Sequence, residues 1–347
     1  MSGTLARLRG PNNEGLLVAV ILVVVVGMAL ASPAFFSAST FFALVRSSMV
    51  PLIFALGVLL VLISGGIDVS FPAIAIFAAY ATVKWVTEAG ADPGPLLVFA
   101  IAMAVGGVLG LLNGVVIARF RLSTLIVTLG TQTIFKGVLI AYVGSVYISA
   151  ADLPASIGDL SGAHLVDVQG GGYLHFMIVP VAIVAVLIAL MLRRTVFGRS
   201  IYAIGGDIEA ARRVGIRVVR TQVWLYVLVG ALAAFGGMLY VVLGRNANPQ
   251  SIVGTELDII AAVVLGGASI FGGRGSVLGT VLGVVLVQLI NNNLVLLGIP
   301  STWQRAAVGM LLLLGVGVQA LAATRGRRPG VHLDKTDVKP DVKEVAA

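Results

Sequence analysis

Long apolar runs fill most of this sequence and limit what it can fold into. Of its 347 residues, 59% are hydrophobic and 11% are charged, and the mean hydropathy is +1.06. Soluble domains carry about a quarter charged residues, and about 20 consecutive apolar residues are enough for a helix to cross the hydrocarbon core of a bilayer. The sequence therefore predicts an all-α integral membrane protein.

About ten apolar runs are candidates for transmembrane helices joined by short loops. They lie at about 15–31, 48–63, 72–86, 96–118, 124–143, 174–192, 221–243, 257–270, 277–297 and 303–322. A cleavable signal peptide is an alternative interpretation of the first run, because Ala29-Leu30-Ala31 resembles a cleavage site. We expect residues 1–14 to form a polar N-terminal segment, 15–322 the polytopic domain and 323–347 a disordered tail, since the tail is charged and lacks apolar periodicity.

The positive charges are distributed unevenly, and this gives an orientation. Lys and Arg gather in the cytoplasmic loops of membrane proteins. If the ten runs are followed from a cytoplasmic N-terminus, 18 of the 23 Lys and Arg residues fall on the cytoplasmic side. We therefore expect both termini in the cytoplasm and residues 144–173, which contain no Lys or Arg, on the outer side. The net charge of +8 has this cause, so no nucleic-acid partner is expected.

One long charged stretch interrupts the apolar pattern. Residues 193–220 contain seven Arg, one Asp and one Glu. A short helix is indicated inside this stretch, because Asp207 can cap it, Glu209 favours its first turn, Arg212 and Arg213 favour its last turn, and Gly215 ends it. Such a short helix is not stable alone in water. We expect the stretch to be a cytoplasmic docking element that a separate soluble partner holds.

The sequence lacks the motifs of several kinds of enzyme. It contains no Cys, no G-x-x-x-x-G-K-[ST] loop that would hold ATP and no H-E-x-x-H zinc motif. The expectation is therefore that the chain is not an enzyme and binds no cofactor or metal itself.

Polar residues within the apolar runs are candidates for a solute pathway, because each is costly in lipid unless it meets a partner or water. Asp68 and Ser70 follow Gly65-Gly66, and an interfacial turn that caps the next helix explains them equally well. Hydrogen bonding between helices is the alternative for the remaining candidates. The residues selected for the pathway are Asp68, Ser70, Asn113, Thr128, Gln132, Gln288 and Asn292.

Four segments in this order resemble one known family. They are ISGGIDVS at Ile63–Ser70, LNGVVIARFRLSTLIVTLGT at Leu112–Thr131, FGRSIYAIGGDIEAARRVGI at Phe197–Ile216 and VVLGGASIFGGRGSVLGTVLG at Val263–Gly283. The chain resembles, over about residues 15–322, the permease subunits of bacterial ATP-binding-cassette (ABC) sugar importers of the ribose type, which are related to branched-chain amino-acid permeases. Phe71-Pro72-Ala73 departs from the Val-Gly-Ser that the family usually has after its Asp-Leu-Ser. This departure concerns the assignment to the family's usual monosaccharide subgroup, and the resemblance to the family as a whole does not depend on it.

The resemblance implies a fold, partners and a function. It implies a multi-pass protein of the bacterial inner (plasma) membrane that works with cytoplasmic ABC ATPase subunits, a periplasmic substrate-binding protein, and a second permease copy or a sister permease. ATP would be bound by the partner subunits. The ATPase-docking residues of the cytoplasmic coupling-helix loop, residues 193–220, would be Gly205, Gly206, Asp207, Glu209, Ala210, Ala211, Arg212 and Gly215.

The expected function is therefore the inward translocation of a sugar or sugar-like solute by alternating access. The alternatives are a related importer of branched-chain amino acids or nucleosides, an ion-coupled secondary transporter, and a membrane scaffold or receptor. A secondary transporter would need ionisable groups within the membrane, and Asp68 and Lys136 are poor candidates because they are expected near the interfaces.

Overall fold

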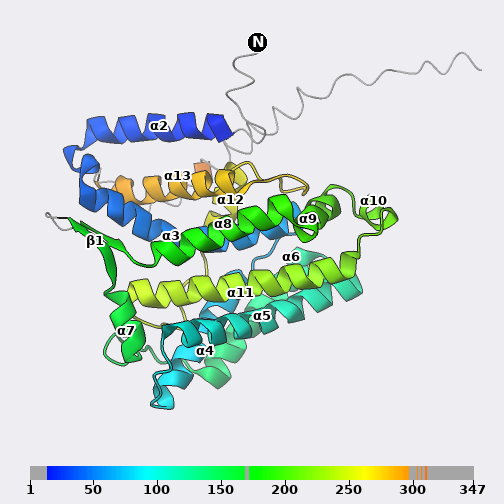
Figure 1. Cartoon of the computed structure of the whole chain (residues 1–347), viewed down its shortest axis with the longest axis horizontal. Helices are drawn as coiled ribbons and strands as arrows, with labels where there is room; N and C mark the ends of the chain where they lie inside the picture. Colours follow the sequence, from blue (N-terminus) through cyan, green and yellow to red (C-terminus); the bar gives the residue numbers. More distant parts are fainter. Residues whose placement is uncertain (1–13, 169–171, 297–302, 304–305, 307–308, 311–347) are drawn as a thin grey trace, which may run out of the picture.

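The computed structural model describes residues 14–168, 172–296, 303, 306, 309 and 310. The described chain is mostly helical, and its long helices run roughly side by side along one direction (Figure 1). The long helices are α2 Glu14–Ala31, α3 Ala38–Ile63, α4 Phe71–Glu88, α5 Pro95–Phe120, α6 Thr124–Val138, α8 Ile178–Arg194, α11 Val218–Gly244 and α13 Val277–Leu296. The shorter elements are η1 Pro33–Phe36, the π-helix η2 Leu139–Val143, α7 Ala155–Ser161, α9 Val196–Gly206, α10 Ile208–Arg213 and α12 Glu256–Leu265.

Four helices of the described chain are long and apolar enough to cross a membrane, and they confirm a membrane protein. They are α3, α5, α6 continued by η2, and α11; α8 and α9 make a fifth if this pair, bent by 71°, is one span. The expected count of ten is not confirmed. The run expected at 257–270 gives only the ten residues of α12, because the chain turns at Gly266 and Gly267. The run expected at 303–322 lies almost entirely outside the described residues.

The most extensive helix contact in the bundle is between α5 and α11; α3 packs against α11, and α4 packs against both. Glycines allow the two backbones to touch. A Cβ placed on Gly106 would lie 2.4 Å from the carbonyl oxygen of Gly230, and one on Gly110 would lie 2.1 Å from that of Tyr226. Close approach of this kind is how helices associate in lipid, where no hydrophobic force drives them together.

Between α3 and α4 the chain is not helical, although it is largely buried. Its backbone groups need partners there, because unpaired N–H and C=O groups are costly away from water. The hydroxyl of Thr124 accepts a hydrogen bond from Ile67 N at 2.9 Å, and that of Thr128 accepts one from Val69 N at 3.3 Å. Pro72 lies in the first turn of α4, where proline is tolerated, and α4 begins within one residue of the run expected at about 72–86.

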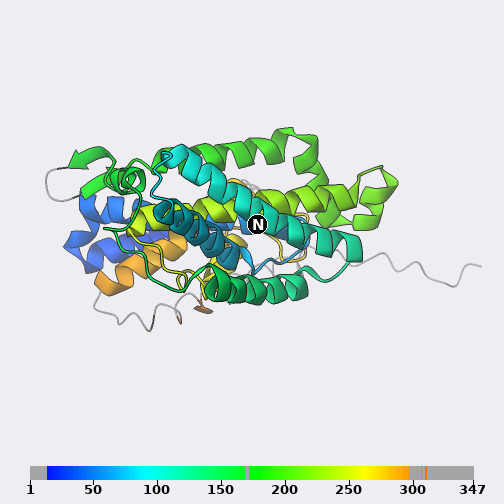
Figure 2. The same cartoon turned by 90° about the horizontal axis from the view of Figure 1, so that it is seen from below.

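The expected all-α fold with short loops needs one correction. The region between η2 and α8 contains α7 and an antiparallel pair of strands, β1 His164–Val168 and β2 Gly172–His175 (Figure 1). The strand pair lies against the first half of α3, since a Cβ on Gly172 would touch Ser39 and Phe42. Figures 1 and 2 place this strand pair at the opposite end of the bundle from α10.

Helix α2 is set apart from this core. Its residue Leu17 is buried together with Leu286 and Ile290 of α13, in a small cluster separate from the main one. Glu14 accepts a hydrogen bond from Ser276 at 2.6 Å, so the start of α2 lies beside the start of α13.

Candidate functional site: an exposed capped helix and buried polar breaks

The charged stretch 193–220 folds into a sharp corner followed by α10. Helix α9 was not predicted from the sequence. Thr195 ends α8 and caps α9, because its hydroxyl accepts a hydrogen bond from Gly198 N at 3.0 Å. Gly198 makes the corner possible, since a Cβ at this position would lie 2.3 Å from the carbonyl oxygen of Met191. The corner directs α9 across the end of the bundle and into α10.

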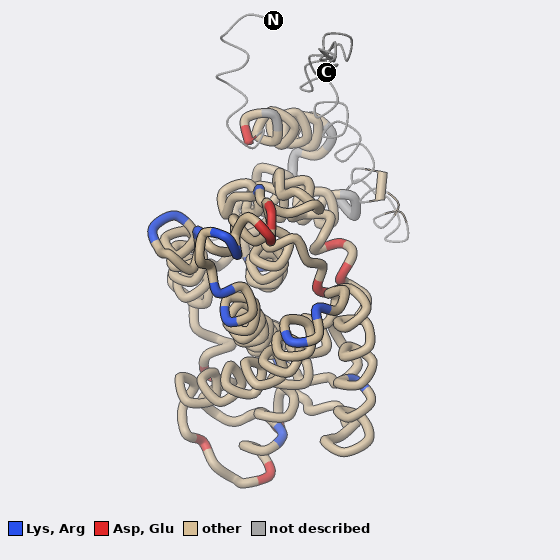
Figure 3. Tube along the Cα trace, turned by 90° about the vertical axis from the view of Figure 1, so that its right-hand side faces the viewer, with Lys and Arg blue, Asp and Glu red and all other residues tan. Residues whose placement is uncertain are grey.

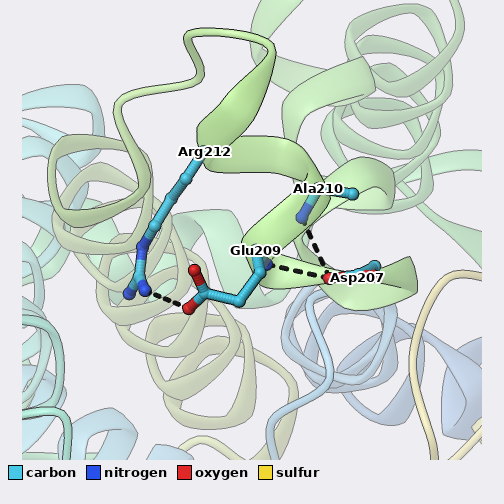
Figure 4. A network of polar contacts seen from close by, with 4 residues as sticks. All are labelled: Asp207, Glu209, Ala210 and Arg212. Atoms are coloured by element: carbon cyan, nitrogen blue, oxygen red, sulfur yellow. Dashed lines mark hydrogen bonds and ion pairs between the residues drawn. The ribbon is translucent and has the colours of Figure 1, made fainter. Parts of the chain in front are cut away.

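The short helix α10 has the caps that the sequence predicted (Figure 4). Asp207 Oδ1 accepts hydrogen bonds from Glu209 N at 2.9 Å and Ala210 N at 3.0 Å. These backbone N–H groups hold the pKa of the Asp207 carboxyl below its usual value. Glu209 and Arg212 form an ion pair on the helix surface. Gly215, with φ of +86°, ends the helix, and Ile216 N donates to the carbonyl oxygen of Ala211 at 3.1 Å.

One face of α10 packs on its own chain. Ala211 is 2% exposed and lies in a small apolar cluster with Ile204 of α9 and Val218 of α11. The expectation that only a partner could hold this helix is therefore wrong, because α9 and α11 already supply a docking face for it. The opposite face is open, with Asp207, Glu209 and Ala210 exposed and Val214 77% exposed.

The predicted docking residues divide into two groups by position. Gly205 and Ala211 face the bundle, whereas Gly206, Asp207, Glu209, Ala210 and Gly215 are exposed and Arg212 is partly exposed. Basic residues gather at the same end of the molecule (Figure 3). They lie at the end of α5 (Arg119, Arg121), of α8 (Arg193, Arg194) and of α10 (Arg212, Arg213), and around the start of α11 (Arg217, Arg220).

Four of the predicted pathway residues meet inside the bundle and support the break between α3 and α4. Asp68 Oδ1 accepts hydrogen bonds from the N–H and the hydroxyl of Ser70, both at 2.7 Å, and Asn113 Nδ2 donates to the Ser70 hydroxyl at 2.8 Å. Asp68, Ser70, Asn113 and Thr128 are each at most 1% exposed. In this conformation their side chains bond to the backbone and to one another, and they are too buried to contact a solute.

The other three pathway residues are more accessible. Gln132 of α6 donates a hydrogen bond to the carboxylate of Glu256, which in turn accepts from Gly254 N at the start of α12. Asn292 of α13 donates to the Ser47 hydroxyl at 2.6 Å. Gln288 lies one turn before Asn292 on α13 and is partly exposed. The structure thus brings together Gln288 and Asn292 on one helix, and it places Gln132 on another.

A pocket of about 420 Å³ lies beside Asn292 and contains residues that the sequence did not single out. It is lined by α3, α11 and α13, and its polar side chains are Arg46, Ser47, Tyr240 and Asn292. Arg46 precedes the apolar run expected at 48–63, but α3 begins at Ala38 and contains it. Its guanidinium donates to the carbonyl oxygen of Leu243 at 2.6 Å and to the hydroxyl of Tyr173. The available signal for a longer helix was Ser37, a residue type that caps helices, whose hydroxyl accepts a hydrogen bond from Thr40 N.

These features define a class of protein. The long apolar helices place the chain in a membrane, its unwound polar segment is buried between helices, and one face of α10 is exposed at one end of the bundle, an arrangement suited to a membrane-embedded transport subunit. Within the described part of the chain, no group of three or more His, Asp or Glu side chains could hold a metal ion.

Comparison with known proteins gives the family. The model of the family described as "Branched-chain amino acid transport system / permease component" matches residues 40–316, and the chain belongs to this family of transport permeases, which are not enzymes. The ribose import permease protein of Escherichia coli K12 is 33% identical over 299 residues, which is 85% of this chain and 90% of the relative. The galactose/methyl galactoside import permease protein of Haemophilus influenzae is 34% identical over 319 residues, covering 87% and 92% of the two chains. An autoinducer 2 import system permease protein of Yersinia enterocolitica is 31% identical over 302 residues, covering 87% and 81%.

Proposed function

We propose that this chain is the membrane permease subunit of an ATP-driven importer that moves a sugar or sugar-like solute inward by alternating access. The observation that carries the proposal is α10, a capped helix held on its own chain by one face and open on the other, in a member of a transport permease family whose relatives are named as sugar importers. The chain has no ATP-binding loop of its own, so the energy source would be a separate ATPase subunit.

In this proposal the ATPase subunit binds the open face of α10. The contact residues would be Gly206, Asp207, Glu209, Ala210 and Arg212, which are exposed or partly exposed. Gly205, Ala211 and Gly215 would act indirectly, by holding α10 at its place and ending it. The end that carries α10 would face the cytoplasm of a bacterial inner membrane, because its many Arg residues follow the positive-inside rule.

The opposite end, with α7 and the β1–β2 strand pair, would face the periplasm and receive solute from a binding protein. A second copy of this chain or a sister permease would complete the pathway. Gln132, Gln288 and Asn292 are the residues proposed to meet the solute, since side-chain amides both donate to and accept from the hydroxyls of a sugar. Asp68, Ser70, Asn113 and Thr128 would shape the pathway from behind by fixing the break.

Co-purification tests the docking step. The ATPase subunit encoded with this permease is expected to co-purify with the wild-type chain, and Ala210→Trp and Asp207→Lys are expected to abolish this. Asp207→Asn is the matched control for the second change, because Asn also caps helices and keeps the side-chain shape. Val146→Trp, at the opposite end and 73% exposed, controls for adding an exposed Trp. Binding that survives both Ala210→Trp and Asp207→Lys would contradict the assignment of α10.

Uptake into vesicles tests the reaction. With the ATPase subunit and the cognate binding protein present, we expect uptake of a labelled sugar that requires ATP. Competition by amino acids or nucleosides, and not by sugars, would favour the related importers. Uptake that follows a proton or sodium gradient and ignores ATP would instead identify a secondary transporter.

A further inference from the structure

Three segments that are far apart in the sequence meet beside α10 with their backbones in direct contact. They are the end of α3 at Ile63 and Gly65, the end of α9 at Gly205, and the segment 268–276 between α12 and α13. A Cβ on Gly205 would lie 1.7 Å from the carbonyl oxygen of Ile63 and 2.8 Å from Gly273 N. A Cβ on Gly272 would lie 2.5 Å from the carbonyl oxygen of Gly205 and 2.9 Å from Gly65 Cα. We call this contact the three-glycine junction, after Gly65, Gly205 and Gly272.

Hydrogen bonds join the same segments independently of the glycines. Gly273 N donates to the carbonyl oxygen of Ile63 at 2.9 Å, which ties the 268–276 segment to the end of α3. The hydroxyl of Tyr202 on α9 donates to the carbonyl oxygen of Gly275 at 2.8 Å. Gly65 and Gly272 have φ of +84° and +91°, a backbone conformation that other residues rarely adopt. The junction is therefore held by backbone shape and by two hydrogen bonds.

Helix α10 is attached rigidly to this junction. Only Asp207 separates α9 from α10, and its N–H donates to the carbonyl oxygen of Ala203 at 3.1 Å while its side chain caps α10. Ala211 of α10 also packs with Ile204 of α9. Closely packed backbones leave no free volume for sliding. A displacement of α10 therefore also moves the segments that meet at the junction, which are the end of α3 and the 268–276 segment.

We propose that α10, α9, the last turn of α3 and the 268–276 segment form one rigid body, in which Gly205 and Tyr202 are positioning residues. This inference rests on the proposed function for its source of movement. A partner that displaces α10 would then move both non-helical breaks of the described chain that lie beside the junction, the one before α4 and the one before α13. The first break carries Asp68 and its buried polar partners, and the second leads into the helix that carries Gln288 and Asn292.

Distances between two spin labels test the rigid body, first in the chain alone and then in the complete importer. The chain contains no Cys, so Val214→Cys and Phe271→Cys, which are 77% and 94% exposed in the wild type, give a single labelled pair. We expect a narrow distance distribution that stays the same when ATP is added to the complete importer and that broadens in Gly205→Ala. Gly137→Ala on α6, where a Cβ meets nothing within 4 Å, should leave the distribution narrow. A distance that changes with ATP in the wild-type background would overturn the proposal.

The ratio of solute taken up to ATP hydrolysed tests the functional role. In the reconstituted importer, with the ratio measured only on complexes that contain the ATPase subunit, Gly205→Ala should lower it severalfold, because the added Cβ separates α9 from Ile63. Tyr202→Phe removes a single hydrogen bond of the junction and should lower the ratio less. If Gly205→Ala does not fold, the Tyr202→Phe variant alone tests the functional role of the junction. Wild-type ratios in the folded variants would overturn the proposal. Failure of the wild-type chain to bind an ATPase would instead overturn the proposed function.

Discussion

Thr128 places its hydroxyl on a stretch of buried backbone that has no helix to satisfy it. It accepts from Val69 N and donates to the carbonyl oxygen of Ile67, each at 3.3 Å. The sequence alone does not separate such a structural hydroxyl from one that meets a solute, since both are small, polar and located in an apolar run. Only the three-dimensional position of the α3–α4 break makes the distinction.

Thr128→Val therefore tests the structural role. The valine keeps the shape and leaves Val69 N and Ile67 O without this partner, which should cost about 1–3 kcal/mol of stability. Thermal unfolding in detergent measures the loss. Thr133→Val on the exposed side of the same helix is the matched control, because the Thr133 hydroxyl bonds only within α6, to Leu129 O at 3.1 Å, and its loss should change the midpoint little.

His175 gives a residue-scale prediction for pH. Its Nδ1 accepts from Met177 N at 3.1 Å and its Nε2 pairs with the carbonyl oxygen of Ser161 at 3.2 Å, so the neutral ring satisfies both neighbours. Burial lowers the pKa of the His175 imidazole below its usual value, and the nearby positive charges of Arg46 and Arg245, together with His164, act in the same direction.

The sign of the pH effect follows from this lowered pKa. The stabilising contribution of neutral His175 is complete above about pH 6.5 and decreases as the pH falls from there towards the lower pKa of the folded state. We expect the thermal midpoint to fall over this interval. His175→Gln, which does not titrate, should show a smaller change, and an equal pH dependence in the two chains would contradict the prediction.

At the scale of elements, α5 and α11 show why glycine spacing matters more than apolarity. Both helices are apolar around their circumference, so the sequence predicted that each exists and not which face meets which neighbour. The contact is decided where glycines remove the side chain, at Gly106, Gly110 and Gly230.

Two nearby glycines of α5, Gly107 and Gly110, provide a matched pair of variants. Gly110→Ala would place a methyl group 2.1 Å from the carbonyl oxygen of Tyr226 and must push α11 away, whereas Gly107→Ala meets its nearest atom at 3.7 Å, an ordinary contact. We expect Gly110→Ala to lower the yield and thermal midpoint of the folded protein strongly and Gly107→Ala to leave both near wild type. Similar behaviour of the two variants would show that the helices are not packed through this face.

The elements that sequence reasoning predicted best are those with local signals. Single residues mark these local features, and the structure confirms them: the caps of α10 at Asp207 and Gly215, and the start of α4 at Pro72. Helix α9 and the β1–β2 pair were missed, because α9 is stabilised by burying Ile201 and Ile204 at the corner and the strands by lying on α3, and both are tertiary contacts. The burial of Ala211 was missed for the same reason.

At the scale of the whole molecule, the two ends of the bundle differ in charge and in structure, and labelling can test which end faces the cytoplasm. Val214→Cys lies at the α10 end and Tyr147→Cys at the end with the strand pair, and the native residues are 77% and 54% exposed. A membrane-impermeant maleimide should label Tyr147→Cys in cells with a permeable outer membrane and Val214→Cys only in inverted vesicles. The reverse pattern would invert the proposed orientation.

Helix α2 has a consequence for how chains of this family can differ in length. Its main packing partner in the described chain is α13, and the family model begins its match at residue 40, after α2 and η1. Removing α2 would expose one side of α13 to lipid acyl chains. The packing of α5 against α11 would remain unchanged. A hydrophobic N-terminal helix could thus be gained or lost at this position while the rest of the helix bundle stays unchanged. Such a change would also alter the side of the membrane on which the N-terminus lies.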